Sequence, residues 1–326
     1  MNIKLCTSPI FIIGLPRSGT KLFREILNNH DKIFIPNAES LFIPFLVKKY
    51  GFLPDFSLKK NKILFKQDLL KSVYCINMSI SIRDLNDPSF NKVLESNSWH
   101  YIFQFLFDNM VNKSKNNVIF GDKTPSYIYH LPLLHKIFPK AKFLHIIRDP
   151  RDQAVSAKTA WNKSIYLSAS NWYKSISLVK SYVKQNKINY IELKYEDLIV
   201  SPIVYLKKIF NFIDLEFYDD MLKFSKSVEN IGEAKGFKFI KKNNFNKFNT
   251  SLTEQQIKKI ESLTFPLIKS LGYNLKNNIK YHKELSLFEE FFCKVNDFIS
   301  NYIFHFKDKG LIKGYFYLKG LNQSNI

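Results

Sequence analysis

The sequence predicts an α/β fold in three layers, with a central parallel sheet between two layers of helices. Short apolar runs alternate along the chain with segments of helical periodicity, and a 326-residue chain that is 45% hydrophobic can fill a sizeable core. The predicted strands are Ile10–Ile13, Val118–Phe120, Lys142–Arg148 and Tyr190–Lys194. Strands separated by helices favour a parallel sheet that binds its ligand at the carboxyl ends of the strands.

The first predicted strand leads into a loop that suits an anion. Pro16–Thr20 (Pro-Arg-Ser-Gly-Thr) separates this strand from a helix in which Leu22 and Phe23 begin an apolar face. The backbone N–H groups and the positive dipole end of a helix N-terminus favour phosphate or sulfate. We therefore predict a phosphate-loop fold. The structural alternative is an ordinary turn with Arg17 on the surface.

The loop differs from the one that binds ATP or GTP with magnesium. Gly14 and Gly19 have the separation of a Walker loop, but Thr20 and Lys21 follow in reversed order. No apolar run ends in an isolated acidic residue placed like a Walker metal ligand. The positive charge lies early in the loop, at Arg17. This pattern predicts phosphate binding without a metal, and a nucleotide kinase or NTPase remains the alternative enzyme class.

The other helices follow from their caps and apolar spacing. Asp149 and Pro150 suit the N-cap and first position of a helix that runs to Trp161. Ser251–Glu254 resembles a capping box for a helix that ends at Ser270. The remaining predicted helices are Trp99–Val111, Tyr129–Phe138, residues 170–184, residues 201–213 and an aromatic helix of about residues 285–306.

A second anion site is indicated where the third strand meets its helix. Arg148 offers a planar guanidinium suited to phosphate, and the Ser156 hydroxyl follows two helical turns later. Taken alone, the segment could be a capped helix with exposed charges. Together with Pro16–Thr20, it indicates a nucleotide that carries phosphate groups at both ends.

With these paired segments, roughly residues 8 to 275 resemble the sulfotransferases that use 3′-phosphoadenosine 5′-phosphosulfate (PAPS). The pattern is most similar to the bacterial and protein-tyrosine sulfotransferase-like members, and Tyr195–Leu198 (Tyr-Glu-Asp-Leu) resembles a third family segment. The resemblance implies a metal-independent transferase that moves a sulfuryl group from PAPS to a hydroxyl or amine. It implies that the residues that bind PAPS are Arg17, Ser18, Gly19, Thr20, Lys21, Arg148, Ser156 and Tyr195.

The resemblance also implies three catalytic residues. Lys123 is placed like a family lysine near the sulfuryl group, and Arg17 would stabilise the leaving phosphate. Pro125 follows Lys123-Thr124 where cytosolic family members have a catalytic histidine, so that base is absent. Glu39 is the base that we favour, because the protein-tyrosine subgroup has a glutamate just after the first loop and helix. A solvated Glu39 and a surface Lys123 are the alternatives.

The domain organisation follows from the extent of the resemblance. Residues 1–275 form the predicted sulfotransferase domain, within which residues 50–97 are an insertion or a substrate-contact region. A Gly- and Lys-rich loop begins near Ile231, and its part Gly236–Lys242 is expected to cover the nucleotide. Residues 276–326 are a C-terminal helical extension. For its aromatic helix, packing or a homodimer contact is the favoured interpretation, and interfacial membrane binding the less favoured one.

Charge and cysteine content narrow the function classes. The formal net charge is +21, but no block of five or six consecutive basic residues marks a nucleic-acid arm. A basic nucleic-acid-binding protein ranks last because it leaves the paired loops unexplained, so no nucleic-acid partner is expected. Cys6, Cys75 and Cys293 lie far apart, which favours a reducing compartment and excludes a cysteine metal motif. We expect a cytoplasmic enzyme whose acceptor is a carbohydrate, lipid, small metabolite or peptide.

Overall fold

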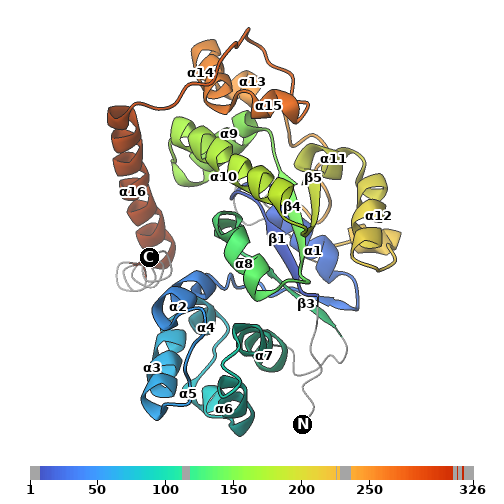
Figure 1. The fold of residues 1–326 in the computed structure, drawn as a ribbon. Coiled ribbons are helices and arrows are strands. Elements are labelled where there is room, and N and C mark those ends of the chain that lie inside the picture. The colour runs from blue at the N-terminus through green and yellow to red at the C-terminus, as the bar shows by residue number, and fades with distance from the viewer. Residues whose placement is uncertain are drawn as a thin grey trace.

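A five-stranded parallel sheet forms the centre of the molecule (Figure 1). The computed structural model describes residues 8–111, 118–224, 226–227, 236–310, 314 and 318, so Cys6 and Ile231 lie outside the described residues. The strand order is β2-β3-β1-β4-β5, and every neighbouring pair is parallel. The strands are β1 (Ile10–Ile13), β2 (Ile33–Phe34), β3 (Ile119–Lys123), β4 (Lys142–Ile147) and β5 (Asn189–Lys194). The chain moves from β1 to one side of the sheet and then crosses to the other, so a ligand crevice is expected at the end of β1.

Helices cover both faces of this sheet, which confirms the predicted three layers. Ile10 and Ile12 of β1 pack on one face against α1 (Thr20–Asn28), α11 (Tyr195–Val200) and α12 (Pro202–Phe212). Phe11 and Ile13 point to the other face, where α7 (Trp99–Val111), α8 (Leu131–Ile137) and α10 (Ile165–Gln185) complete the core. All four β1 residues are buried. The continuous apolar run is therefore that of a strand covered on both sides.

The end of β3 lies further along the chain than the sequence predicts. The predicted strand stops at Phe120, but β3 continues to Lys123, and Lys123 pairs with Ile12 of β1. The apolar run ends at Phe120, and Gly121, Asp122 and Lys123 do not extend it. In the structure, Gly121 allows two strands to approach, since a Cβ atom there would lie 2.5 Å from the carbonyl oxygen of Ile10. Lys123 is thereby placed beside the strand that carries the phosphate loop.

One predicted helix is confirmed and two others have different bounds. The helix after Asp149 is α9 (Pro150–Trp161), and the Asp149 side chain caps it as predicted. The predicted helix of residues 129–138 is instead a 3-10 turn (Pro125–His130) followed by α8. The predicted helix of residues 170–184 begins earlier, because Ser164 caps α10 by accepting a hydrogen bond from the backbone N–H of Leu167.

The predicted capping box is displaced by two residues. Ser251 ends α13 (Phe248–Ser251), and Thr253 is the N-cap of α14 (Glu254–Thr264), where it exchanges hydrogen bonds with Gln256. The chain leaves α14 before Pro266, so the helix that the sequence extends to Ser270 is divided into α14 and α15 (Leu267–Ser270). Helix α16 covers Leu287–Lys309, and a 3-10 turn covers Asp219–Leu222.

Residues 42–111 form a helical lobe beside the sheet (Figure 1). Phe56, Phe65 and Trp99 form its aromatic centre, with 4.8 Å between the ring centroids of Phe56 and Phe65. The predicted helix Trp99–Val111 is confirmed with the same bounds. Besides α7, the lobe contains α2 (Phe42–Tyr50), α3 (Lys59–Leu70), α4 (Val73–Asn77), α5 (Ile82–Leu85) and α6 (Pro88–Leu94).

Gly121→Ala tests the close approach of β3 and β1. The added Cβ would meet backbone, which cannot move aside without displacing a central strand. We expect a loss of about 1–3 kcal/mol in the free energy of unfolding, measured by urea denaturation. Lys60→Ala, at an exposed position of α3, is the control and should change stability by less than about 0.5 kcal/mol. Equal midpoints for both variants would contradict this account.

Candidate active site

The loop after β1 is built to leave the N-terminus of α1 open. Gly19 is the N-cap of α1 at a φ of 91°, and Arg17 has a φ of 71°. Gly19 has no side chain that could accept hydrogen bonds from the first turn, and that turn contains no acidic residue. A helix N-terminus of this kind favours an anionic ligand.

One cavity of about 420 Å³ lies at this loop and at the carboxyl ends of β3, β4 and β5. Ser18 is the one predicted site residue that does not line the cavity, and it is buried within the loop. Segments from six parts of the chain meet in this single cavity. The predicted residues that line it are Arg17, Gly19, Thr20, Lys21, Glu39, Lys123, Arg148, Ser156 and Tyr195.

Arg148 joins the phosphate loop to the loop of residues 236–247. Its Nη1 donates to the carbonyl oxygen of Arg17 at 3.0 Å, and its Nη2 donates to that of Asn244 at 2.9 Å. Its Nε is buried and has no hydrogen-bond acceptor among the described residues. A buried donor without an acceptor costs about 1–3 kcal/mol, so an anionic ligand atom at this position would remove a penalty.

Tyr195 closes over the phosphate loop from the end of β5. A Cβ atom on Gly19 would lie 2.3 Å from the Tyr195 ring, so only glycine permits this contact. The Arg148 guanidinium lies 4.6 Å from the centre of the same ring. The Asn244 side-chain amide donates to the Tyr195 hydroxyl at 2.6 Å, and its Oδ1 is buried without a partner among the described residues.

Ser156 contacts the first loop as well as lying near Arg148 in the cavity. Its hydroxyl accepts a hydrogen bond from Arg17 Nε at 3.1 Å. The Arg17 guanidinium carbon also lies 5.4 Å from the centre of the Trp161 ring, at the end of α9. Gln153 of the same helix donates to the carbonyl oxygen of Pro16 at 2.9 Å. The two predicted anion segments are therefore one connected structure.

Glu39 and Lys123 form an ion pair in the cavity, with 2.5 Å between Oε1 and Nζ. Lys123 is almost buried, whereas the Glu39 side chain is 37% exposed. The next residue, Ser40, fixes this segment, because its backbone N–H donates to Thr124 Oγ1 at 3.0 Å and its hydroxyl contacts the Tyr127 hydroxyl. The carboxylate is therefore accessible but held beside a cation.

The sequence predicts no acidic residue at the end of a strand in the position of a Walker metal ligand, and Asp122 bears on this prediction. With β3 extended to Lys123, an acidic residue does lie near the end of the strand beside β1. Its carboxyl group is buried and does not line the cavity. Burial raises the pKa of Asp122 to about 6, and the hydroxyl groups of Thr124 and Ser40 and the charge of Lys123 oppose this shift.

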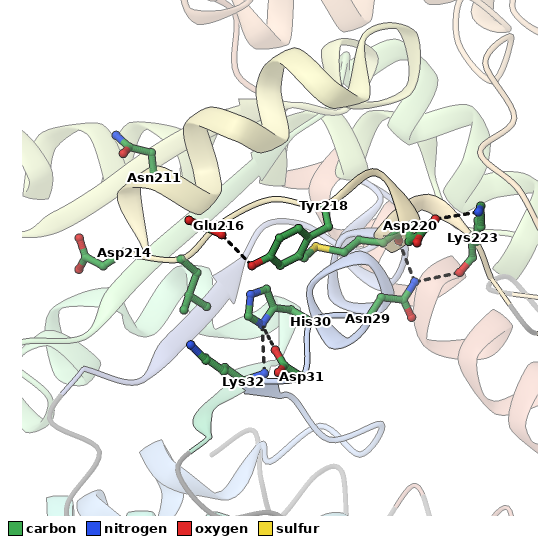
Figure 2. Close-up of a pocket in the computed structure, with 12 residues that line it drawn as sticks. Asn29, His30, Asp31, Lys32, Asn211, Asp214, Glu216, Tyr218, Asp220 and Lys223 are labelled. Atoms are coloured by element: carbon green, nitrogen blue, oxygen red, sulfur yellow. Dashed lines mark hydrogen bonds and ion pairs between the residues drawn. The ribbon is translucent and has the colours of Figure 1, made fainter.

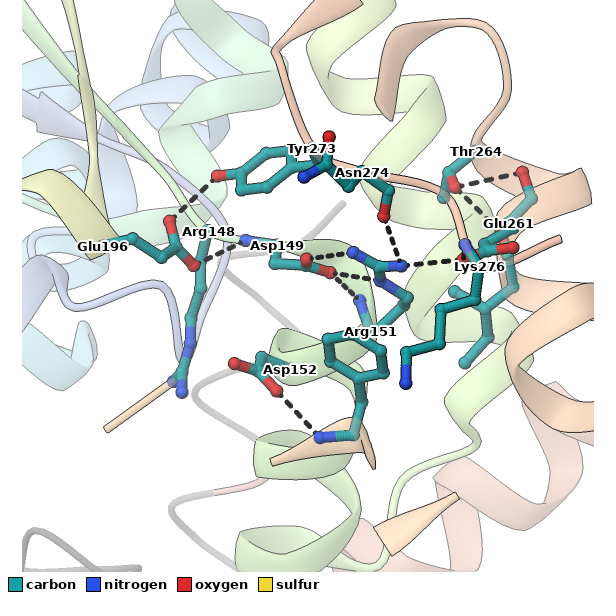
Figure 3. A network of polar contacts seen from close by, with 12 residues as sticks. Arg148, Asp149, Arg151, Asp152, Glu196, Glu261, Thr264, Tyr273, Asn274 and Lys276 are labelled. Carbon is teal, nitrogen blue, oxygen red and sulfur yellow. Dashed lines mark hydrogen bonds and ion pairs between the residues drawn. The ribbon is translucent and has the colours of Figure 1, made fainter. Parts of the chain in front are cut away.

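A buried polar network fixes the start of α9, directly after Arg148 in the chain (Figure 3). Arg151 pairs with Asp149 at 2.6 Å and with Glu261 of α14 at 2.7 Å, and all three side chains are buried. Glu261 also accepts hydrogen bonds from the backbone N–H groups of Lys276 and Asn277. The network ties the start of α9 to the chain more than a hundred residues later. The sequence gives no local signal for it.

Glu196 holds the backbone next to Arg148. It accepts hydrogen bonds from the backbone N–H of Asp149 and from the Tyr273 hydroxyl, each at 3.0 Å (Figure 3). Trp172 Nε1 donates to the carbonyl oxygen of Arg148 at 2.9 Å. Burial raises the pKa of Glu196 to about 7, although the backbone hydrogen bond from Asp149 favours the charged form.

A larger cavity, of about 1010 Å³, lies at the far end of α1 and contains none of the predicted site residues (Figure 2). His30, which the sequence assigns to a helix end, lies there after α1 and is buried against Phe210. Its Nδ1 accepts a hydrogen bond from the backbone N–H of Lys32, and burial lowers the pKa of His30. His145, which the sequence assigns to the core, is buried beside Tyr190.

The chain belongs to the sulfotransferase family. The sequence profile described as "Sulfotransferase family" matches residues 9–220, well over half of the chain. The omega-hydroxy-beta-dihydromenaquinone-9 sulfotransferase Stf3 of Mycobacterium bovis is 24% identical over 64% of this chain and 63% of its own length. Protein-tyrosine sulfotransferase 1 of Danio rerio is 24% identical over 70% of this chain and 58% of its own length. The chain thus spans less than two thirds of these relatives.

A solved structure supports the fold. The sulfotransferase domain from the Synechococcus PCC 7002 olefin synthase superimposes with a TM-score of 0.53 and 19% identity, over 84% of this chain and 98% of that domain. The predicted family, its similarity to bacterial and protein-tyrosine members, and the α/β phosphate-loop fold are therefore confirmed.

The pH dependence of stability tests the burial of Glu196. Its folded pKa of about 7 exceeds the ordinary value of 4.5, so the folded state binds more protons between these pH values. The contribution of Glu196 to stability is therefore fully present below the lower value and is lost as the pH rises through the higher one. Between pH 4.5 and 8, the wild type should lose on the order of 2 kcal/mol relative to Glu196→Gln in denaturant unfolding.

Glu284→Gln, at an exposed carboxyl group, is the control for this measurement and should show a much smaller change with pH. A difference between wild type and Glu196→Gln that stays constant over this range would contradict the assignment.

Proposed function

We propose that this chain transfers a sulfuryl group from PAPS to a hydroxyl or amine of an acceptor. One observation carries the proposal: Arg148 lines the cavity, its guanidinium binds the backbone of the phosphate loop, and its buried Nε has no acceptor among the described residues. An open helix N-terminus and a second cationic site in one cavity suit a ligand with phosphate groups at both ends. In this proposal, residues 1–275 are the catalytic domain.

The residues fit PAPS at its two charged ends. Arg148, the Ser156 hydroxyl and Tyr195 would hold the 3′-phosphate. Arg17, Thr20, Lys21 and the backbone N–H groups of the loop from Ser18 to Thr20 would hold the 5′-phosphosulfate. PAPS supplies the sulfuryl group, with the adenosine 3′,5′-bisphosphate as the leaving group. The buried donor of Arg148 and the buried acceptor of Asn244 Oδ1 are polar atoms that a nucleotide could satisfy.

Glu39 and Lys123 have complementary roles in the proposed transfer. Glu39 accepts the proton of the acceptor hydroxyl or amine while the new bond to sulfur forms. Lys123 and Arg17 stabilise the negative charge that the leaving phosphate oxygen gains as its bond to sulfur breaks. In the structure, the Lys123 ammonium pairs with the Glu39 carboxylate. Lys123 would then turn from Glu39 toward the donor when PAPS binds.

The proposal leaves the class of the acceptor open, places the enzyme in the cytoplasm and disfavours a kinase activity. The relatives are named for a menaquinone and for protein tyrosine, so their names leave the chemical class of the acceptor open. Cys75 and Cys293 are unpaired, which agrees with a cytoplasmic location. A nucleotide kinase, the alternative enzyme, is disfavoured by the order Thr20-Lys21.

Nucleotide binding separates these activities. We expect 3′-phosphoadenosine 5′-phosphate (PAP) to bind more than about tenfold tighter than ADP by calorimetry, without Mg²⁺. Arg148→Lys keeps the charge but loses the guanidinium fork, and should weaken PAP about 10- to 100-fold. ADP should weaken less than PAP, because it has no 3′-phosphate and loses only the support that Arg148 gives to the phosphate loop. Lys207→Ala, at an exposed position of α12 outside the cavity, is the control. Mg²⁺-dependent preference for ADP would instead favour a kinase.

Glu39→Gln tests the proposed base. The amide keeps the shape of the side chain but cannot accept the proton, so kcat should fall about 10²- to 10⁴-fold with PAP affinity unchanged. Turnover is measured with labelled PAPS and whichever member of a panel of phenols, alcohols and amines the wild type sulfates. Glu192→Gln, which changes a glutamate in another ion pair with a lysine outside the cavity, is the matched control. Unchanged turnover in Glu39→Gln would remove Glu39 from the mechanism.

A further inference from the structure

Helix α16 presents its apolar face to solvent. Six of its large side chains are between 52% and 90% exposed: Leu287, Phe288, Phe291, Phe292, Phe298 and Ile299. At 100° per residue they fall within an arc of roughly 140° on one side of the helix. In Figure 1, α16 stands at the edge of the molecule, beside α9 and α10.

The polar face of α16 holds the helix in this orientation. The Asp297 carboxylate accepts a hydrogen bond from the backbone N–H of Ser164 at 2.6 Å, and the Ser300 hydroxyl donates to the carbonyl oxygen of Asn162 at 3.1 Å. Glu289 pairs with Lys259 of α14 at 2.5 Å. The helix cannot turn its apolar side inward without breaking these contacts. The usual arrangement of a surface helix, with its apolar face on the core, is therefore reversed.

The exposed face is larger than a monomer normally leaves open. From the exposed fractions and the usual areas of these side chains, its apolar area is roughly 700 Å². The largest apolar patch of a typical monomer is about 300–600 Å², and larger patches mark interaction sites. The size of this face therefore indicates a binding surface for a partner. Each of its side chains is more than half exposed, so packing against the described part of the chain is not its role.

The partner could be a second copy of the chain or a lipid surface, and charge distinguishes between these two. The chain carries a formal charge of +21, so two copies repel each other while an anionic lipid surface attracts each one. The acidic side chains beside the apolar arc are compensated, since Glu289 pairs with Lys259 and Glu290 lies 2.8 Å from Lys294. Among the described residues, no helix has the length and hydropathy to cross a bilayer. A helix with one apolar face lies in the plane of the interface.

We propose that the exposed face of α16 docks on the surface of an anionic lipid bilayer. Phenylalanine, leucine and isoleucine side chains enter the boundary between headgroups and acyl chains, and the protein body lies on the polar side of the helix. The contact segment Asn162–Ser164 directly follows Trp161, which lines the cavity. The helix that docks is therefore attached next to the candidate active site.

Vesicle binding by the full-length protein tests this proposal. Vesicles of phosphatidylcholine with about 30 mol% phosphatidylglycerol are compared with phosphatidylcholine alone by flotation. The wild type should bind the anionic vesicles, and the double variant Phe291→Ser/Phe298→Ser should lower partitioning at least about tenfold. Phe239→Ser, which changes an equally exposed phenylalanine outside α16, should bind as the wild type does.

Two further readouts make each outcome decisive. The thermal midpoint and PAP affinity of the double variant should match the wild type, because both side chains are exposed and lie outside the cavity. Equal vesicle binding by the double variant and the wild type would overturn the proposal. So would light scattering that shows a wild-type dimer and a monomeric double variant, which would assign the face to a second copy. Loss of PAP binding in the wild type would instead refute the proposed function and leave docking intact.

Discussion

The hydrogen bond from Arg148 to the carbonyl oxygen of Arg17 joins the two loops on which the candidate site depends. It exists because β1 and β4 are parallel neighbours, with Ile13 paired to His145, so both strands deliver their following residues to the same edge. Glycine makes the junction tight enough, since Gly14 and Gly19 leave no room for a Cβ atom beside Ile146 and Tyr195. The sheet register and two glycines thus determine where a ligand can bind.

Arg148 and Arg151 are both buried, and their hydrogen-bond partners distinguish the arginine that stabilises the fold from the one that is available to a ligand. Arg151 is buried with hydrogen bonds to Asp149 and Glu261, so its charge is compensated within the fold. Arg148 is equally buried, but its hydrogen bonds among the described residues go to backbone carbonyl groups. A carbonyl dipole compensates a buried cation less fully than a carboxylate does. The remaining positive potential points to an anionic ligand at Arg148.

Local patterns predicted the parts of the site that lie next to strands, and contacts between distant segments account for the rest. Pro16–Thr20 and Arg148 follow buried apolar runs, so their place at the edge of the sheet could be inferred from the sequence. Asn244 and Trp161 reach the cavity from a loop and a helix end, where no periodicity marks them. The predicted end of β3 was wrong because the apolar run stops at Phe120, whereas the strand continues through Gly121, which allows β3 to approach β1 closely.

The C-terminal helix shows a different limit of sequence patterns. Apolar spacing correctly indicated an aromatic helix, and it defines which side of α16 is apolar. It does not say which side meets the protein, because that depends on Ser164, Asn162 and Lys259, which lie in other elements. Here polar contacts with those residues orient the helix, and the apolar side is left outward. The same contacts attach α16 next to the end of α9, where Trp161 lines the cavity. The bonds that expose the apolar face thus also fix its position relative to the candidate active site.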